Sequence, residues 1–204
     1  MPSLVAFLTL LFSLVAGMKD PWSPLRARAD AGSSYDRLQW GMMNWFGAQG
    51  LSYKTLLADP AVDAELGRKL ITEEALDGNW MAGPIYLYKL ERPSPDRWKK
   101  LAEAGHPMAV SMHALDVALS HCGDGVVPEP EIVTFQARYL PRMDLMGQLD
   151  RMPRNPNARS RRIEGVTKEY LTTVYFVENI NLHVPEICGN ASQILQYLGY
   201  TDPA

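Results

Sequence analysis

The stretch "GHPMAVSMHALDVALSHCG", from Gly105 to Gly123, predicts the fold class of this 204-residue chain. Its large apolar side chains recur every three or four residues, at Met108, Met112, Leu115 and Leu119. That spacing places them on one face of an α-helix, because an α-helix has about 3.6 residues per turn. Pro107 separates this helix from the one predicted before it, and Gly123 ends the pattern.

The same spacing recurs along the rest of the chain. It predicts further helices with apolar positions at Leu38, Met42 and Phe46, at Leu66 and Leu70, at Ile132, Phe135 and Tyr139, and at Ile194, Leu195 and Leu198. Asp59 followed by Pro60 is typical of a helix start. Residues 83–93 and 170–177 are rich enough in aromatic or β-branched residues to be strands instead. Together these patterns predict a mainly α, irregular multi-helix protein.

Residues 1–18, "MPSLVAFLTLLFSLVAGM", contain no charged side chain. As a helix they would be about 27 Å long, slightly short of a bilayer core of about 30 Å. Lys19, Arg26 and Arg28 follow the apolar run, and Trp22 suits a membrane interface. We favour a transmembrane anchor, or an apolar helix buried in a larger complex, with the bulk of the chain on the cytosol-like or matrix-like side. A secretory signal peptide is the alternative, although no Lys or Arg precedes the apolar run.

We expect four parts. Residues 1–18 form the anchor, 19–34 a linker, 35–122 a helical core, and 123–204 a C-terminal helical extension with an Arg-rich loop at 151–162. The formal net charge of −3 and the pI near 5.8 argue against nucleic acid as the main partner, because phosphate binding needs a basic face.

The sequence shows no known catalytic motif among its Ser, His, Asp and Glu residues. His113 and Asp116 share a helix face, but Ser111 lies roughly 200° around the same helix from His113. This segment alone therefore cannot assemble a Ser-His-Asp triad, and we expect an ordinary surface contact between His113 and Asp116. The sequence contains no nucleotide-binding loop and no metalloprotease motif. We predict neither catalytic nor cofactor-binding residues.

The two cysteines, Cys122 and Cys188, allow one disulfide bond, which the sequence cannot confirm. We favour two buried thiols. With His121 and His183 they match no common zinc-binding spacing, so we predict no metal site. Asn190-Ala191-Ser192 is a glycosylation sequon that matters only on a secretory route, and Asn190 is also a suitable cap for the last helix.

A run of basic residues without an intervening acid precedes the last helices. It consists of Arg151, Arg154, Arg159, Arg161 and Arg162. The Pro and Asn residues among them predict an extended, solvated loop. The same run would suit the head groups of anionic lipids or an acidic partner subunit.

A series of short marks between Leu38 and Ala104 supports a family resemblance. They are Trp40 and Asn44, Gly50-Leu51, Tyr53, Leu56-Leu57-Ala58-Asp59, Arg68-Lys69-Leu70 before Glu73-Glu74, and Pro95 before Trp98. In this order the segment resembles the ubiquinol–cytochrome c reductase binding protein family, the small matrix-side subunit of mitochondrial complex III. The family has Pro after its basic-basic-Leu mark, where this chain has Ile71.

The resemblance implies a non-catalytic accessory subunit of the mitochondrial inner membrane. Its bulk would lie on the matrix side and pack against cytochrome b and the core subunits, with lipid at residues 1–18. The expected partner or lipid contacts are Trp40, Trp45, Tyr53, Trp98 and the five arginines above. The alternatives are an accessory subunit of complex I, complex IV or ATP synthase, a secreted glycoprotein with a signal peptide and one disulfide, and a membrane-anchored enzyme that uses His113 or His121.

Overall fold

The structure is a computed structural model that describes residues 22–46, 63–90, 92–152 and 156–200. These residues are mainly α-helical and include no strand, which confirms the predicted fold class. The segment for which a strand was the alternative at 83–90 forms α5 (Gly83–Ile85) and the π-helical turn η2 (Tyr86–Leu90). The segment at 170–177 is part of α10 (Pro156–Glu178). The chain divides into two compact units, residues 1–67 and 68–204.

In the first unit, α2 (Ser23–Asp30) packs against α3 (Ser34–Phe46). The expectation of a linker over residues 19–34 is therefore wrong for 23–30, because Leu25 and Ala29 lie on one helix face and are buried. Gly32 makes the turn between the two helices with a φ of +89°, a conformation that glycine adopts at no steric cost.

The start of α4 (Ala64–Leu76) lies against α3 at two glycines. A Cβ atom added to Gly67 would lie 2.5 Å from the backbone N of Trp45 and 2.8 Å from the carbonyl oxygen of Gly41. Asp63 caps α4 by accepting a hydrogen bond from the Leu66 N–H at 3.0 Å. The predicted cap at Asp59 lies outside the described residues.

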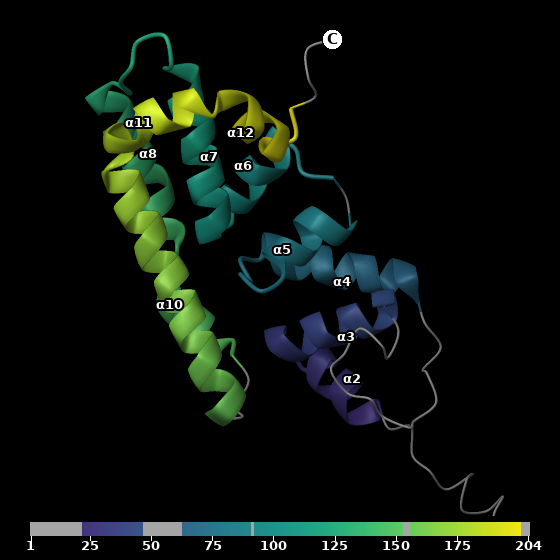
Figure 1. Ribbon diagram of the computed structural model, residues 1–204. Helices are drawn as coiled ribbons and strands as arrows, with labels where there is room; N and C mark the ends of the chain where they lie inside the picture. Colours follow the sequence, from purple (N-terminus) through teal and green to yellow (C-terminus); the bar gives the residue numbers. More distant parts are fainter. Residues whose placement is uncertain (1–21, 47–62, 91, 153–155, 201–204) are drawn as a thin grey trace, which may run out of the picture. The chain divides into compact units, whose positions relative to one another are not determined.

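The second unit is organised around α7 (Pro107–Ser120). The helices α6 (Pro95–Glu103), α10, α11 (Ile180–Gly189) and α12 (Ala191–Leu198) pack against α7 (Figure 1). Ala109, Ala114 and Ala118 of α7 are fully buried, whereas the large side chains that predicted the helix are only half-buried. Small side chains allow neighbouring helices to approach closely, so the alanine face, and not the Met and Leu face, lies deepest in the core.

The remaining helices complete this unit. They are α8 (Glu129–Tyr139), followed by the 3₁₀ turn η3 (Leu140–Arg142), and α9 (Leu145–Asp150). Both α8 and α9 contact α10. The predicted division at residues 122 and 123 is therefore wrong, because helices from the expected extension surround α7. The predicted Arg-rich loop at 151–162 is also helical from Pro156 onwards, since Pro fits the first turn of α10.

Cys122 and Cys188 form a disulfide bond with a Cα–Cα distance of 5.5 Å. The prediction of two buried thiols was wrong. Cys122 lies two residues after the end of α7 and Cys188 lies in the last turn of α11, and the packing of these two helices brings the cysteines together.

Buried polar side chains hold the connection between α4 and α5. The Gln148 side chain donates from Nε2 to the Gly78 carbonyl oxygen at 2.5 Å and accepts at Oε1 from the Trp80 N–H at 3.0 Å. His106 lies 2.6 Å from the Ala75 carbonyl oxygen through Nε2. Burial lowers the pKa of His106 to about 4, so its imidazole is neutral at neutral pH.

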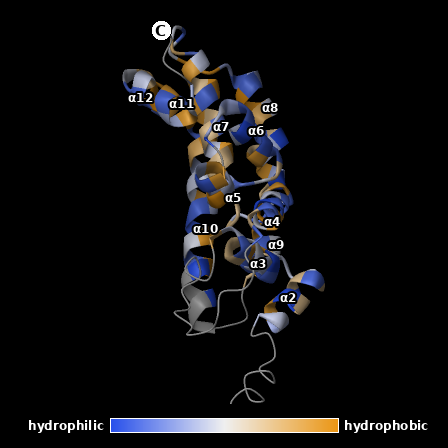
Figure 2. Cartoon of the chain, turned by 90° about the vertical axis from the view of Figure 1, so that its right-hand side faces the viewer, coloured by the Kyte–Doolittle hydropathy of each residue, from blue (hydrophilic) through white to orange (hydrophobic). Residues whose placement is uncertain are grey.

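Within the described ranges, no helix has the length and the apolar composition needed to cross a bilayer. Figure 2 shows hydrophilic and hydrophobic residues interspersed along the helices of the second unit. The predicted anchor, residues 1–18, lies outside the described residues.

Candidate functional site

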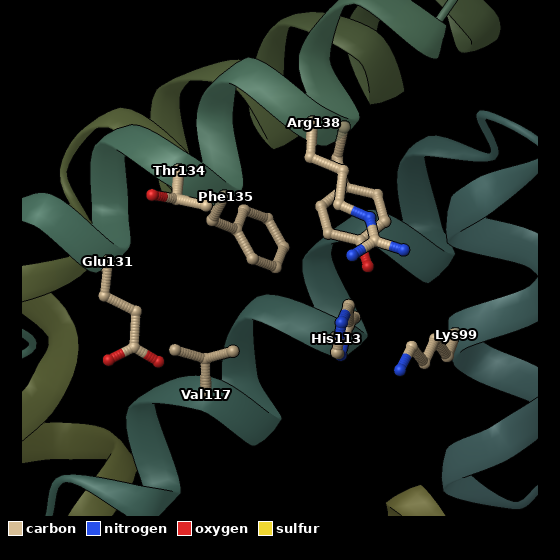
Figure 3. Close-up of a pocket in the computed structure, with 8 residues that line it drawn as sticks. Lys99, His113, Val117, Glu131, Thr134, Phe135 and Arg138 are labelled. Carbon is tan, nitrogen blue, oxygen red and sulfur yellow. The ribbon is translucent and has the colours of Figure 1, made fainter.

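A surface pocket of about 170 Å³ lies between α6, α7 and α8 in the second unit. Figure 3 shows the side chains around it. They are Lys99 from α6, His113 and Val117 from α7, and Glu131, Thr134, Phe135, Arg138 and Tyr139 from α8. Residues one helical turn apart share a face, which is why α8 presents several of them to the same space.

His113 is half-buried against two aromatic rings of α8. Its ring centroid lies 5.4 Å from that of Phe135 and 5.2 Å from that of Tyr139, which it meets edge-on. Burial lowers the pKa of His113, and the positive charges of Lys99 and Arg138 act in the same direction against the opposing charge of Asp116. At neutral pH the pocket therefore contains an uncharged imidazole.

The Glu103 carboxylate interacts with two arginines, Arg138 and Arg142, beside the pocket. Arg138 donates to the Glu103 carboxylate through Nη2, and Tyr139 donates to the same oxygen at 3.3 Å. Arg142 donates from Nη1 to the Glu103 backbone carbonyl at 3.1 Å. Burial alone would raise the pKa of Glu103, but the hydrogen bond and charge of Arg138 outweigh it and lower that pKa. Arg138 is thereby neutralised, whereas Lys99 forms no ion pair with any residue in the described part of the chain.

The residue types considered for catalysis are engaged elsewhere. Ser111 forms a hydrogen bond of 2.9 Å with Thr173, and Asp116 accepts one of 2.7 Å from the Tyr200 hydroxyl. That bond to Asp116, together with burial, raises the pKa of Tyr200 to about 12. The expectation of a simple surface contact between His113 and Asp116 is thus incomplete, since His113 packs mainly against aromatic rings.

The pocket suits non-covalent binding of a small acidic group. Its aromatic wall offers apolar contact, and the exposed Lys99 ammonium offers a cation at the rim. Glu131 is held by His121, whose Nε2 lies 2.8 Å from the Glu131 carboxylate. These groups can bind and orient a ligand.

The predicted tryptophan contacts fall in different environments. Trp98 is only 1% exposed, and its indole N–H donates to the Leu198 carbonyl oxygen at 3.2 Å. It is a core residue of the second unit, where its ring lies against those of Tyr197 and Tyr88. Trp40 is also buried, whereas Trp45 is half-buried.

The predicted arginines are also dispersed. Arg151 donates to the backbone oxygen of Asp77 at 3.0 Å and to its carboxylate at 3.3 Å. Arg159 donates to the Leu149 carbonyl oxygen at 3.5 Å, and Arg162 approaches the Met81 sulfur at 3.3 Å. Of the remaining predicted contacts, Tyr53 and Arg154 lie outside the described residues, as does the side chain of Arg161.

The residues weighed as metal ligands are separated by their own interactions. The two cysteines are bonded to each other, and His183 lies against Phe176 with 5.3 Å between ring centroids. His121 contacts Glu131 and Asp124. No group of three or more His, Cys, Asp or Glu residues within the described ranges could hold a metal ion.

Sequence reasoning missed the pocket although it identified some of its members. The apolar spacing predicts a helix at each of His113, Phe135 and Tyr139, but no motif in the sequence groups Lys99, Thr134 and Arg138. The available signal was the spacing Thr134–Arg138 and Glu131–Phe135, one helical turn each. Only the packing of α8 beside α7 adds His113 to that face.

Comparison with known proteins adds no relative: no family model matches the chain, and neither a curated protein nor a solved structure is found to match it.

Proposed function

We propose that this chain is a non-catalytic binding protein of an oxidising compartment, made as a disulfide-bonded glycoprotein on the secretory route. The Cys122–Cys188 bond carries this proposal. Disulfide bonds persist in secreted and lumenal proteins, whereas the thiols of cytosolic proteins are kept reduced. The apolar residues 1–18 would then be the signal peptide.

The glycosylation sequon lies two residues after Cys188. Asn190 is exposed at the junction of α11 and α12, and its side-chain amide donates to the Glu186 carbonyl oxygen at 2.9 Å. The Asn190 side chain therefore pairs with a backbone carbonyl group in the last turn of α11, and it makes no capping hydrogen bond to α12. An exposed Asn in such a sequon is an acceptor for a glycan in the secretory route.

The binding role rests on the pocket between α6, α7 and α8. Ser111 and Asp116 are engaged with Thr173 and Tyr200, and the pocket itself combines His113 with an apolar wall and the Lys99 cation. We propose that a small acidic group of the binding partner occupies this pocket.

Mass spectrometry of the chain from its own cells tests the compartment. We expect a peptide pair joined at Cys122 and Cys188, a glycan on Asn190, and no peptide that begins at Met1. Ser192→Ala is the matched control, because it removes the sequon and leaves the Asn190 hydrogen bond to Glu186 in place. An intact Met1 peptide together with an unmodified Asn190 would refute the proposal.

We propose as a second candidate the accessory subunit of an inner-membrane respiratory complex, complex III first. Its support is the resemblance between Leu38 and Ala104, together with an aromatic pair at the end of α3. Trp45 and Phe46 meet edge-on with 6.3 Å between ring centroids, and Phe46 is exposed. Such a pair suits contact with a partner subunit.

The state of the cysteines separates the two candidates. Alkylation of the native chain during cell lysis would label both cysteines in a reducing matrix and neither in an oxidising compartment. Native electrophoresis in mild detergent gives the second readout. A chain that migrates as a free monomer would exclude the respiratory subunit.

A further inference from the structure

The exposed side of α10 carries a row of large apolar side chains at its C-terminal end. Leu171 is 58% exposed and Tyr175 is 60% exposed, one helical turn apart. Leu182, near the start of α11, is 72% exposed. Single exposed apolar residues are common on protein surfaces, but the Leu171 and Tyr175 pair lies on adjacent turns of one helix face and indicates an interaction surface.

The opposite side of α10 is used by the fold of the second unit. Thr173 and Val177 are buried, and each lies roughly 200° around the helix from Leu171 and Tyr175, respectively. Figure 1 shows α10 as a long helix at the edge of this unit, with α11 turning back towards α7. Packing against α7 therefore leaves the Leu171 and Tyr175 side of α10 exposed.

The charges around this pair are arranged symmetrically. Lys168 precedes Leu171 by three residues, and Glu178 follows Tyr175 by three residues, and both are exposed. They lie about 15 Å apart along the helix axis at 1.5 Å per residue, too far to pair with each other. Position 173 is the midpoint of both the apolar pair and the charged pair.

We infer that this face binds a second copy of the chain, with the two α10 helices antiparallel about a two-fold axis at the level of residue 173. In that arrangement Leu171 meets the partner's Tyr175, and Lys168 meets the partner's Glu178. Each contact occurs twice, as a two-fold interface requires. The apolar pair supplies the buried centre of the interface and the charged pair its rim and its register.

This charge pattern is complementary to itself when two α10 helices pair in the antiparallel direction, which favours a second copy as the occupant. A parallel pairing of two α10 helices would place Lys168 against Lys168 and Glu178 against Glu178, which is repulsive. The antiparallel arrangement places each charged side chain against an opposite charge and each apolar side chain against an apolar one. The inference does not depend on the compartment proposed above.

Sedimentation velocity of the full chain in mild detergent, over a wide range of protein concentrations, tests the inference. We expect a reversible dimer for the wild-type chain. Lys168→Glu and Glu178→Lys should each weaken dimerisation about tenfold or more, because each change places like charges opposite each other at two sites. The double variant Lys168→Glu/Glu178→Lys should dimerise within about threefold of wild type, because the exchange restores both pairs.

Two further variants test whether the dimer forms through this face of α10. Leu171→Asp should abolish the dimer and leave the urea midpoint of the monomer unchanged, because Leu171 is exposed in the chain. Val133→Asp, at an exposed apolar position on α8, is the matched control and should leave the dimer intact. A wild-type chain that is monomeric at every concentration would overturn the inference. A double charge variant as weak as the single variants, or a monomer destabilised by Leu171→Asp, would overturn it as well.

Discussion

The Gln148 side chain, on α9, makes two hydrogen bonds to the backbone of the segment that connects α4 and α5. Replacing Gln148 by alanine removes both bonds. The Trp80 N–H and the Gly78 carbonyl oxygen would both lose a buried partner. A buried polar group left without a partner costs about 1–3 kcal/mol. We therefore expect Gln148→Ala to lower the free energy of unfolding by about 3 kcal/mol, a large part of the stability of an ordinary domain.

Urea unfolding followed by circular dichroism measures this loss as a lower midpoint at an unchanged slope. Gln148→Met keeps most of the side-chain volume and removes the hydrogen bonds, so it should cost nearly as much as alanine. Gln196→Ala, at an exposed position of α12, should stay within about 0.5 kcal/mol of wild type. If Gln148→Met is as stable as wild type, packing and not hydrogen bonding holds the connection, and the reasoning is wrong.

Three further perturbations test other parts of the fold. The pKa of His106 is about 4 in the folded chain and 6.5 in the unfolded chain, so the unfolded chain binds a proton more readily as the pH falls. The free energy of unfolding should therefore decrease by about 3 kcal/mol between pH 6.5 and 4. Urea titrations of His106→Gln at several pH values should not show that decrease. Ala114→Leu should cost about 1–3 kcal/mol by overfilling the buried face of α7, whereas Ala137→Leu on the exposed face of α8 should cost little in the same assay. Cys122→Ser should cost about 4 kcal/mol, because the bond closes a loop with a sequence separation of 66, and dithiothreitol should destabilise wild type but not this variant.

Helix periodicity predicted the local structure well where the apolar spacing was regular. The Met108–Leu119 spacing identified α7, and the pattern through Phe135 and Tyr139 identified α8. It did not identify which face of α7 lies deepest, because hydrophobic periodicity weights large side chains, whereas close helix packing favours small ones such as Ala114.

The candidate site was predictable only in pieces. His113 and Phe135 could each be placed on a helix from local spacing, but they lie 22 residues apart in sequence and meet only because α7 and α8 are neighbours. The same holds for Trp98, which the family resemblance implied as a partner contact. Its hydrogen bond to Leu198 spans 100 residues, and no local pattern encodes it.

The sequence by itself determined the helical class of this protein, because helix formation depends on residues within one or two turns of each other. It also determined which residue types are present for chemistry and for a disulfide. Tertiary structure alone decided that Cys122 meets Cys188, that α10 to α12 surround α7, and that Lys99 and His113 border one pocket. The physical reason is that these contacts join residues far apart in the chain, and their formation depends on how helix faces fit together in three dimensions.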